Sequence, residues 1–376
     1  LGIDRQHNLI IIGAGNLGQA IANYTNFEKR GFMIKGMFDI NPRLIGLVVR
    51  GVEIRSIDNL EQLTSYAPEF KGAPKFSSVF IQLDGVYENT DWDKEFKASQ
   101  EVGIDTWIIQ YAEGFNDRAE EKTSFYVPTK LPWVTKQYDI MNRMFEAAKQ
   151  NGMKLIVGLY PGDYSKKDTA SPEQYDFLVE RNKQVFDELF ALWGNHPCLD
   201  GWYITEEFHD GSYPVGWQQE PSLSMLANYL QTVAAYIKSK SPKEVCIAPA
   251  LWRGMPADLC GEWFGKIFAQ TPDIDVLYLQ DIGGRCLVDF DVDLPNWFAE
   301  IKKACDANGV IFGVDIESFK ECWCPKITMR TKPWSELEEQ LRVAGMFTDH
   351  ITNFSWATFK PGTDTYEGYK RYIEGK

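Results

Sequence analysis

The length, composition and charge of the chain exclude several classes of protein. Its 376 residues, 44% hydrophobic and 24% charged, exclude a disordered chain and allow a barrel of about 250 residues plus a small second unit. The net charge is −14; residues 1–73 carry +1 and the rest carries −15, which would repel a phosphate backbone. We therefore do not expect nucleic acid as a partner of the larger part.

The first residues carry no recognisable targeting signal. Residues 1–8 are polar and charged, without the basic, apolar and small-residue order of a secretory signal peptide. No run reaches the roughly 18 to 20 apolar residues that span a membrane. We expect a cytoplasmic protein without a membrane partner, and an extracytoplasmic location of the barrel described below stays open.

A glycine motif follows the first expected strand. The apolar run 9–12 precedes Gly13-Ala14-Gly15-Asn16-Leu17-Gly18 and an expected helix over 19–27, which is the strand, G-x-G-x-x-G, helix order of dinucleotide-binding folds. A second strand over 33–38 ends at Asp39, whose carboxylate can accept hydrogen bonds from ribose hydroxyls and favours NAD over NADP. The pattern predicts a partial Rossmann-type βαβ segment.

The amino-acid sequence of residues 1–63 is more specific than the glycine motif alone. The stretches LGIDRQHNLIIIGAGNLGQAIANY, GFMIKGMFDINPRLIG and GVEIRSIDNLEQL resemble the NAD(H)-binding domain of the redox-sensing transcriptional repressor Rex. The resemblance implies NAD(H) as a cofactor of Gly13, Gly15, Gly18 and Asp39. In that family a winged-helix DNA-binding domain precedes this stretch and further Rossmann strands follow it. Neither is found in this sequence, so DNA binding is not expected, and a remnant without NAD affinity is the alternative.

A change of composition marks a junction between two units. Residues 64–76 contain two Pro and one Gly and show neither helical nor strand periodicity, which is typical of a linker. We expect a first unit over 1–63 and a second over 77–376.

The second unit repeats a short β-type run followed by an amphipathic helix. The expected strands are 78–84, 106–111, 154–160, 201–206, 245–252, 276–280, 310–316 and 351–356, and the expected helices include 137–150, 172–192, 223–238, 297–307 and 334–347. Eight such units in about 300 residues predict an α/β fold, the (β/α)8 TIM barrel, rather than an open doubly wound sheet.

The cysteines predict neither disulfides nor a metal site. The seven cysteines, at 198, 246, 260, 286, 305, 322 and 324, are odd in number and irregular in spacing. Cys322 and Cys324 form a C-x-C without a second Cys or His pair nearby, so we assign no metal.

Polar side chains collect at the expected strand ends, where this fold places its chemistry. Because strand side chains alternate between two faces, Glu207 shares a face with Gly201, Tyr203 and Thr205, and Glu317 shares one with Gly313 and Asp315. The small and polar faces are the better candidates for the barrel interior. Glu207 and Glu317 are therefore expected to point into the opening. Glycoside hydrolysis needs two such carboxyl groups, one protonated and one ionised.

The second unit resembles a known family along most of its length. The stretches GVYENTDWDKEF, GIDTWIIQYAEG, GWYITEEFHDG, YLQDIGG and FSWATFKPG look like the bacterial domain of unknown function 4434, a glycosidase-like barrel, over residues 77–373. The arrangement is also similar to the retaining hydrolases with the acid/base at strand four and the nucleophile at strand seven. That clan usually has Asn before the acid/base, where this chain has Thr205 or Glu206.

This resemblance implies roles for named residues. Glu207 is the expected acid/base, Glu317 the nucleophile, and Glu206 the substitute if the strand register slips by one. The residues expected to bind a carbohydrate substrate are Trp252 and Trp356, as a stacking platform, with Gln82, Asp84, Gln110, Tyr160, Gln280 and Asp281.

Other functions stay open at this point. Glu206 and Glu207 could form a solvated loop edge while Glu317 pairs with Lys320 or Arg285. The barrel could bind carbohydrate without cleaving it, or be the passenger of an NAD(H)-responsive regulator. Many of the aromatic side chains could simply fill the barrel core.

Overall fold

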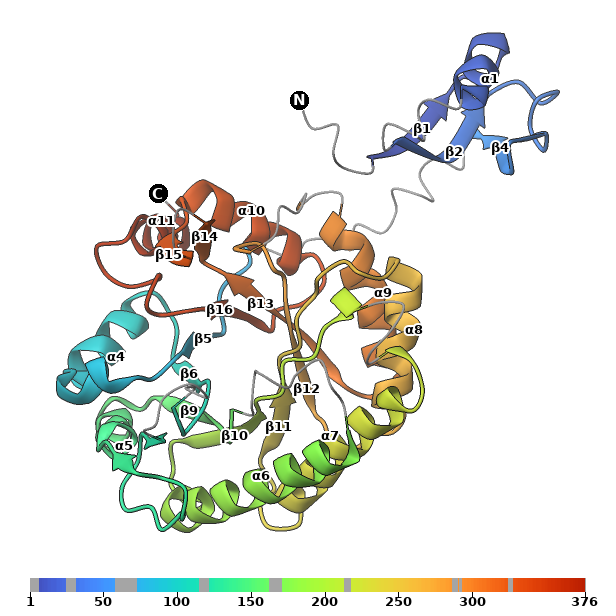
Figure 1. Cartoon of the computed structure of the whole chain (residues 1–376). Coiled ribbons are helices and arrows are strands. Elements are labelled where there is room, and N and C mark those ends of the chain that lie inside the picture. The colour runs from blue at the N-terminus through green and yellow to red at the C-terminus, as the bar shows by residue number, and fades with distance from the viewer. Residues whose placement is uncertain are drawn as a thin grey trace. The chain divides into compact units, whose positions relative to one another are not determined.

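The computed structural model describes two compact units, Leu1–Glu69 and Phe70–Lys376 (Figure 1). The residues described are 7–24, 32–57, 73–114, 122–161, 171–212, 218–285, 290, 293–323 and 327–375. Most of the expected linker and the end of the expected helix 19–27 lie outside them.

The first unit is a small mixed sheet with one described helix. Its elements are β1 (His7–Ile12), α1 (Asn16–Asn23), β2 (Phe32–Asp39), β3 (Val48–Val49) and β4 (Val52–Ser56). The strand order is β1-β2-β4-β3, with β1, β2 and β4 parallel. The predicted Rossmann-type βαβ segment is confirmed.

The second unit contains eight parallel strands that close into a barrel. In chain order they are β5 (Ser78–Ile81), β6 (Thr106–Ile109), β9 (Lys154–Gly158), β10 (Leu199–Ile204), β11 (Glu244–Ile247), β12 (Val276–Gln280), β13 (Ile311–Glu317) and β16 (Ile351–Phe354). The last strand, β16, pairs with the first, β5, which closes the ring. The predicted TIM barrel is confirmed, and the open-sheet alternative is wrong.

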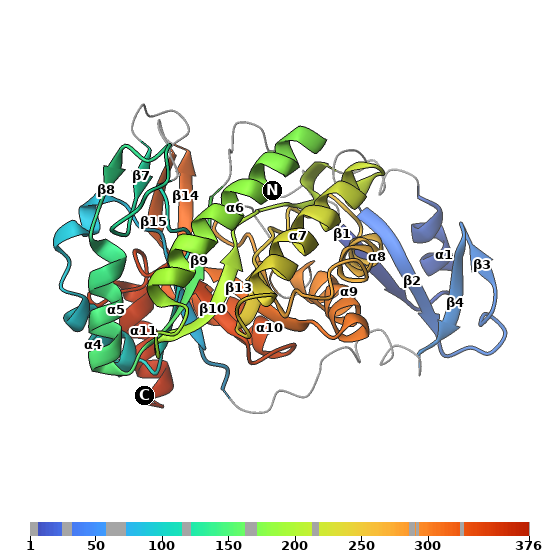
Figure 2. The same cartoon turned by 90° about the horizontal axis from the view of Figure 1, so that it is seen from below.

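Helices surround the barrel, and α6 and α7 run along its outside (Figure 2). The helices are α4 (Trp92–Glu101), α5 (Ile140–Asn151), α6 (Pro172–Trp193), α7 (Ser222–Lys238), α8 (Ala257–Phe268), α9 (Asp293–Asn308), α10 (Trp334–Gly345) and α11 (Asp364–Ile373). Among the described residues, no helix combines the length and the apolar character needed to cross a bilayer.

Shorter elements lie between them: the 3-10 helices η2 (Gly85–Asn89) and η4 (Asp210–Ser212), the paired strands β7 (Thr123–Ser124) and β8 (Lys136–Gln137), and the hairpin β14 (Phe319–Trp323) with β15 (Ile327–Thr331).

Helix α6 illustrates why the outer layer forms where it does. The Ser171 side chain accepts a hydrogen bond from the backbone N–H of Gln174, and Pro172 occupies the first turn, where its missing N–H costs nothing. Leu178, Val185, Phe186 and Leu189 then recur on one side at helical spacing and are buried. The sequence of this segment therefore fixes both the start of the helix and the face that packs on the barrel.

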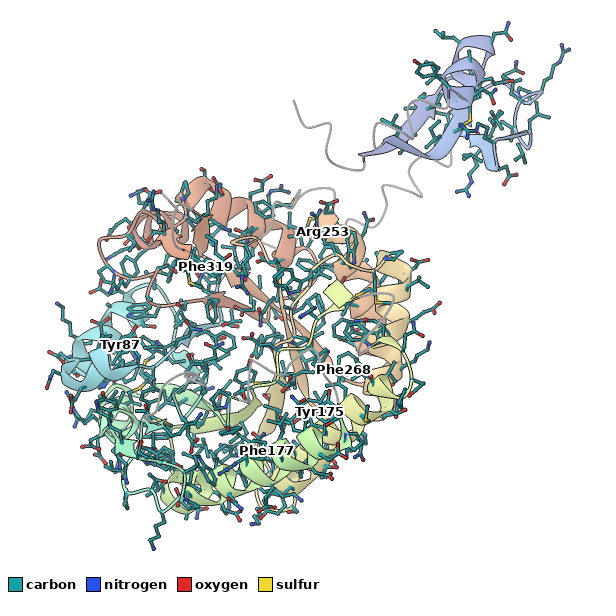
Figure 3. All side chains as sticks on the ribbon, viewed as in Figure 1. Tyr87, Tyr175, Phe177, Arg253, Phe268 and Phe319 are labelled. Carbon is teal, nitrogen blue, oxygen red and sulfur yellow. The ribbon has the colours of Figure 1, made fainter. Side chains whose placement is uncertain are left out.

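Two apolar layers fill the second unit, and side chains occupy the space inside and outside the ring of strands (Figure 3). The outer layer, between strands and helices, includes Trp202, Ile204, Val314 and Ile316. The inner layer includes Phe80, Ile108, Tyr203, Cys246 and Tyr278. Because side chains alternate along a strand, Glu317 and Asp315 lie on the face opposite Val314 and Ile316.

Candidate active site

Glu207 lies three residues beyond the end of β10, and a neighbouring strand supports its carboxylate. Gln110, which follows β6, donates from Nε2 to Oε1 of Glu207 at 3.0 Å. Gln110 is 5% exposed, whereas Glu207 is half-buried.

Glu206 has a different environment from Glu207. It is 7% exposed, and its charge contributes, after burial, to the raised pKa of Tyr229 on α7. The charge of Glu206 thus influences a side chain in the layer between the barrel strands and the helices. Thr205 donates its hydroxyl to the backbone carbonyl oxygen of Tyr160, so the segment after β10 is tied to the end of β9.

Glu317 ends β13 and is 3% exposed. Its Oε2 accepts the backbone N–H groups of Gly284 at 2.6 Å and Arg285 at 3.2 Å. Burial, followed by the charge of Asp281, raises the pKa of Glu317 to about 8 despite these donors. Burial therefore favours the protonated form of this carboxyl group.

Side chains hold the backbone of Glu317 on both sides. Its N–H donates to Oδ1 of Asp281 at 3.2 Å, and its carbonyl oxygen accepts from Nζ of Lys332 at 2.7 Å. Gln340 on α10 joins the two, accepting from Lys332 and donating to Oδ2 of Asp281. All these side chains are at most 1% exposed, except that of Glu317 itself. We call Asp281, Lys332 and Gln340 the Glu317 clamp.

The clamp corrects one prediction from the sequence. Asp281 does not reach toward a substrate, because both of its carboxylate oxygens accept hydrogen bonds from the protein. Burial raises the pKa of Asp281, and the charge of Lys332 opposes that increase. Its role in the structure is to hold Glu317.

The expected alternative partners of Glu317 are used elsewhere. Lys320 pairs with Glu336 at 2.6 Å, and the Arg285 guanidinium pairs with Glu321 at 2.8 Å. Arg285 approaches Glu317 through its backbone N–H, and its charge slightly lowers the pKa of that carboxyl group.

Trp252 is an accessible aromatic side chain beyond the end of β11. It is 38% exposed. The ring centroids of Trp252 and His209 lie 5.5 Å apart, and the guanidinium carbon of Arg285 lies 5.5 Å from the Trp252 ring centroid. Since Arg285 also contacts Glu317 through its backbone, this residue connects the aromatic side chain to the carboxyl group.

Trp356 is not a stacking platform, and this prediction is wrong. It is 2% exposed, its Nε1 donates to Glu95 at 2.6 Å, and its ring lies 4.9 Å from that of Trp107. The side chain belongs to the outer apolar layer. Its position at a strand end does not indicate whether the ring faces the barrel opening or the outer apolar layer.

The remaining predicted binding residues are spread around the strand ends. Gln82 is half-buried after β5, and the exposed Asp84 caps η2 by accepting the N–H of Val86 at 2.7 Å. Gln280 ends β12 and donates to the carbonyl oxygen of Ala248 at 2.6 Å. Tyr160 follows β9, with its ring edge-on to Trp133 and Phe177.

Sequence reasoning missed a buried carboxyl group after β6. Glu113 is 3% exposed, and its Oε2 accepts from Nε1 of Trp133 at 2.9 Å. Burial raises the pKa of Glu113 to about 7. In the sequence, only the place of this acidic residue three positions after Gln110 could have pointed to it. Lys332 and Gln340 were missed because they lie beyond a hairpin and on a helix, not at a strand end.

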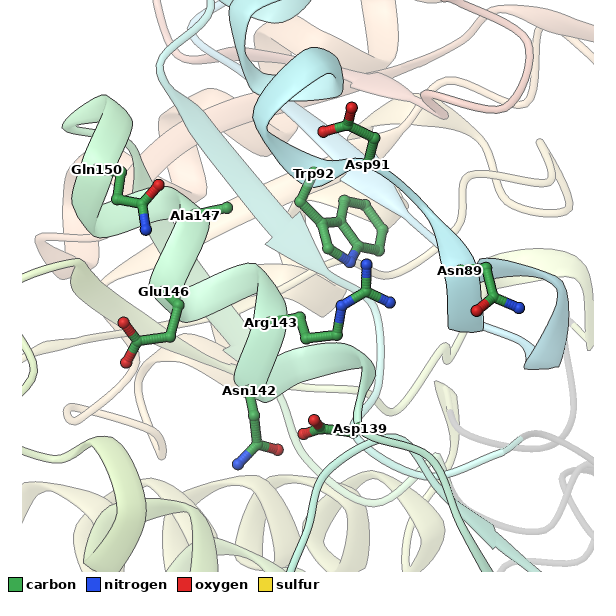
Figure 4. Close-up of a pocket in the computed structure, with 9 residues that line it drawn as sticks. All are labelled: Asn89, Asp91, Trp92, Asp139, Asn142, Arg143, Glu146, Ala147 and Gln150. Atoms are coloured by element: carbon green, nitrogen blue, oxygen red, sulfur yellow. The ribbon is translucent and has the colours of Figure 1, made fainter.

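A separate pocket of about 450 Å³ lies on the outside, between η2, the start of α4 and one side of α5 (Figure 4). Polar side chains line it, among them Asp91, Asn142 and Arg143, and Arg143 donates to the backbone carbonyl oxygens of Glu88 and Thr90. None of the predicted catalytic residues lines this pocket.

The first unit brings the predicted cofactor residues together. Gly13 has a φ of 93°, and a Cβ atom on Gly18 would lie 2.1 Å from the carbonyl oxygen of Gly13, so a glycine is needed there. Oδ2 of Asp39 accepts the N–H of Ala14 at 2.6 Å. Gly15 is the N-cap of α1, where backbone N–H groups suit a phosphate. These residues fit a dinucleotide.

Comparisons with known proteins match the two units separately. Residues 79–364 match the family described as domain of unknown function (DUF4434), and residues 4–69 match the CoA binding domain family. A solved structure from Bacteroides thetaiotaomicron, described as a candidate alpha-L-fucosidase, is 20% identical with a TM-score of 0.62. That match covers 81% of this chain and 95% of the other. At this identity the likeness concerns the fold alone.

Curated relatives match the first unit only. The redox-sensing transcriptional repressor Rex of Clostridium novyi is 67% identical over 61 residues, which are 16% of this chain and 29% of that protein. The Rex of Clostridium acetobutylicum is 61% identical over 61 residues, 28% of its length. The chain thus spans less than a third of these relatives.

Proposed function

The chain belongs to the DUF4434 family, and on that premise we propose that its barrel hydrolyses O-glycosidic bonds with Glu207 and Glu317 as the two carboxyl groups. One observation carries the proposal: Glu207 follows β10 and Glu317 ends β13, so both residues lie at the same end of a closed parallel barrel. Double-carboxylate hydrolysis needs two carboxyl groups at one opening.

The environments of the two groups differ in the way this chemistry requires. Burial raises the pKa of Glu317, whereas half-buried Glu207 accepts a hydrogen bond from Gln110. One carboxyl group can therefore protonate the leaving oxygen while the other is ionised. The exposed Trp252 offers a flat apolar face to a sugar ring.

Two divisions of labour fit this pair. The strand positions assign the acid/base role to Glu207 and the nucleophile to Glu317, which requires the proton to lie on Glu207 when the bond breaks. The raised pKa of Glu317 favours the reverse division, with Glu317 as the proton donor and Glu207 ionised. Both divisions need one proton shared by the pair.

A substrate screen tests the hydrolysis itself. The wild type, Glu207→Gln and Glu317→Gln are incubated with aryl glycosides and oligosaccharides, and released phenol and reducing sugar are measured. We expect cleavage by the wild type and a loss of at least about 1,000-fold in each variant, because neither amide can exchange a proton or attack. Cleavage that persists at full rate in Glu317→Gln removes that residue from the mechanism. Sugar binding without cleavage would support a carbohydrate-binding barrel.

Azide rescue separates the two divisions. Glu207→Ala and Glu317→Ala are assayed with the dinitrophenyl glycoside of the sugar found in the screen, whose leaving group needs no acid. In a retaining enzyme, azide added to the variant without the acid/base gives a glycosyl azide of retained configuration, and the variant without the nucleophile gives the inverted product. Retention with Glu207→Ala supports the division from strand position, and retention with Glu317→Ala reverses it.

For the first unit we propose NAD(H) binding at Gly13, Gly15, Gly18 and Asp39. The backbone N–H groups at the start of α1 would hold the pyrophosphate, and Asp39, whose oxygens keep free lone pairs, would accept the ribose hydroxyls. The identity to Rex proteins over this stretch supports the assignment. Titration with NADH tests it, and a titration without heat would support a remnant without affinity.

A further inference from the structure

Asp315 is a third carboxyl group at the candidate active site. It lies on β13 two residues before Glu317, on the same face of the strand, and is 1% exposed. Its register partners on the two neighbouring strands are Gln280 of β12 and Thr352 of β16. It therefore lies one step deeper in the barrel than Glu317.

The protein leaves part of this carboxyl group without a partner. Oδ1 of Asp315 is buried and has no hydrogen-bond partner among the described residues, and the same holds for Oε1 of Gln110 and Oγ1 of Thr352. By contrast, Asp281 accepts through both oxygens, and Glu317 accepts two N–H groups. Nearly all buried polar groups of native proteins have partners. Asp315 and Thr352 are register partners on neighbouring strands, so two unmet polar groups at one position indicate a place for a ligand or water.

Burial and the nearby acids favour the neutral form of Asp315. Burial and the charges of Glu317, Asp281 and Glu207 raise its pKa well above the usual range. Burial, followed by the charge of Glu207, raises the pKa of Tyr203 on β10. The cations Lys332 and Arg285 lower the pKa of Glu317. A neutral carboxyl group both donates and accepts a hydrogen bond.

We propose that Asp315 binds the substrate directly, as a neutral carboxylic acid that exchanges hydrogen bonds with a hydroxyl group of a neutral sugar. This deepens the proposed function and rests on it. A hydroxyl group also donates and accepts, so it complements both the carboxylic acid and the unmet oxygen of Gln110. A sugar acid or a sugar phosphate would bring a negative charge to a site with several carboxyl groups and is disfavoured.

Isosteric and apolar substitutions separate this role from a structural one. The full chain is prepared as wild type, Asp315→Asn, Asp315→Leu and, as a matched control, Asp349→Asn, whose carboxylate is 98% exposed. Thermal unfolding checks that each variant is folded. The measurements are kcat and KM with the aryl glycoside cleaved by the wild type, and the Kd of glucose, galactose, fucose and N-acetylglucosamine by calorimetry.

We expect Asp315→Asn, which keeps a neutral donor and acceptor, to lose about fivefold in kcat/KM and in sugar affinity. Asp315→Leu should lose about 100-fold in both, and Asp349→Asn should match the wild type. Equal losses in folded Asn and Leu variants, or no loss in the Leu variant, overturn the proposal. So does a wild type that binds none of the four sugars. A wild type that binds sugar with this pattern but cleaves nothing refutes hydrolysis and leaves the role of Asp315 standing.

Discussion

Nζ of Lys332 donates to the backbone carbonyl oxygen of Glu317 at 2.7 Å, and the lysine is completely buried. Burial lowers the pKa of Lys332, while Asp281 and Glu317 favour its charged form. A cation in this place neutralises part of the negative charge at the site and fixes the end of β13. The position of Glu317 therefore depends on a residue that never faces the opening.

Lys332→Met should destabilise the protein by about 3 kcal/mol, because it leaves Asp281 buried without its cation. We also expect kcat to fall by at least about tenfold while KM changes little. The substitution shifts Glu317 from its position but removes no contact with the substrate. Urea unfolding and saturation kinetics measure the two effects. The control is Lys320→Met, which breaks an exposed pair with Glu336 and should cost less than about 1 kcal/mol. Equal effects of the two substitutions would contradict the clamp.

The free energy of unfolding should decrease as the pH rises from about 4.5 to about 8. The pKa of Glu317 is higher in the folded protein than in the unfolded chain, so the native state binds more protons. The stability from this group is fully present below its unfolded pKa and is lost as the pH rises through its folded pKa, by at most about 1.4 kcal/mol per pH unit. Denaturant unfolding between pH 5 and 9 measures the slope. Glu317→Gln should flatten it, and an unchanged slope would place the titration elsewhere.

The two predicted platform tryptophans should respond oppositely to truncation. Trp252→Ala removes a partly exposed ring, so we expect an increase in KM of about tenfold and a stability change within about 1 kcal/mol. Trp356→Ala opens a cavity in the outer apolar layer and should cost about 3 to 5 kcal/mol. Kinetics and thermal unfolding on both variants test this. An unchanged KM in Trp252→Ala would remove that ring from the substrate site.

NADH binding by the first unit should depend on Gly18 and Asp39. Gly18→Ala brings a methyl group against the carbonyl oxygen of Gly13 and should abolish binding, and Asp39→Ala should weaken it about tenfold by removing the ribose acceptor. Calorimetry with the full chain measures both. The control is Glu53→Gln, on the exposed side of β4, which should bind NADH like the wild type.

The sequence by itself determined the alternation of strands and helices and the faces of β10 and β13. These features follow from local patterns, because short apolar runs ending in polar residues alternate with helical stretches that carry an apolar stripe. For this reason the barrel, the glycine loop beside Asp39, and the face shared by Asp315 and Glu317 were all predictable. The family resemblance added the expected roles of Glu207 and Glu317.

Only the tertiary structure decided which polar groups are buried together. Lys332 and Gln340 come from segments after the barrel strand that they support, and nothing in their local pattern indicates a partner 15 or 59 residues away in Glu317 or Asp281. Trp356 and Asp281 stand at strand ends like true site residues, yet packing turns one into the core and uses the other as a support. Burial and charge, which set the proton affinity of Glu317 and Asp315, arise from contacts between distant segments, and local sequence cannot specify them.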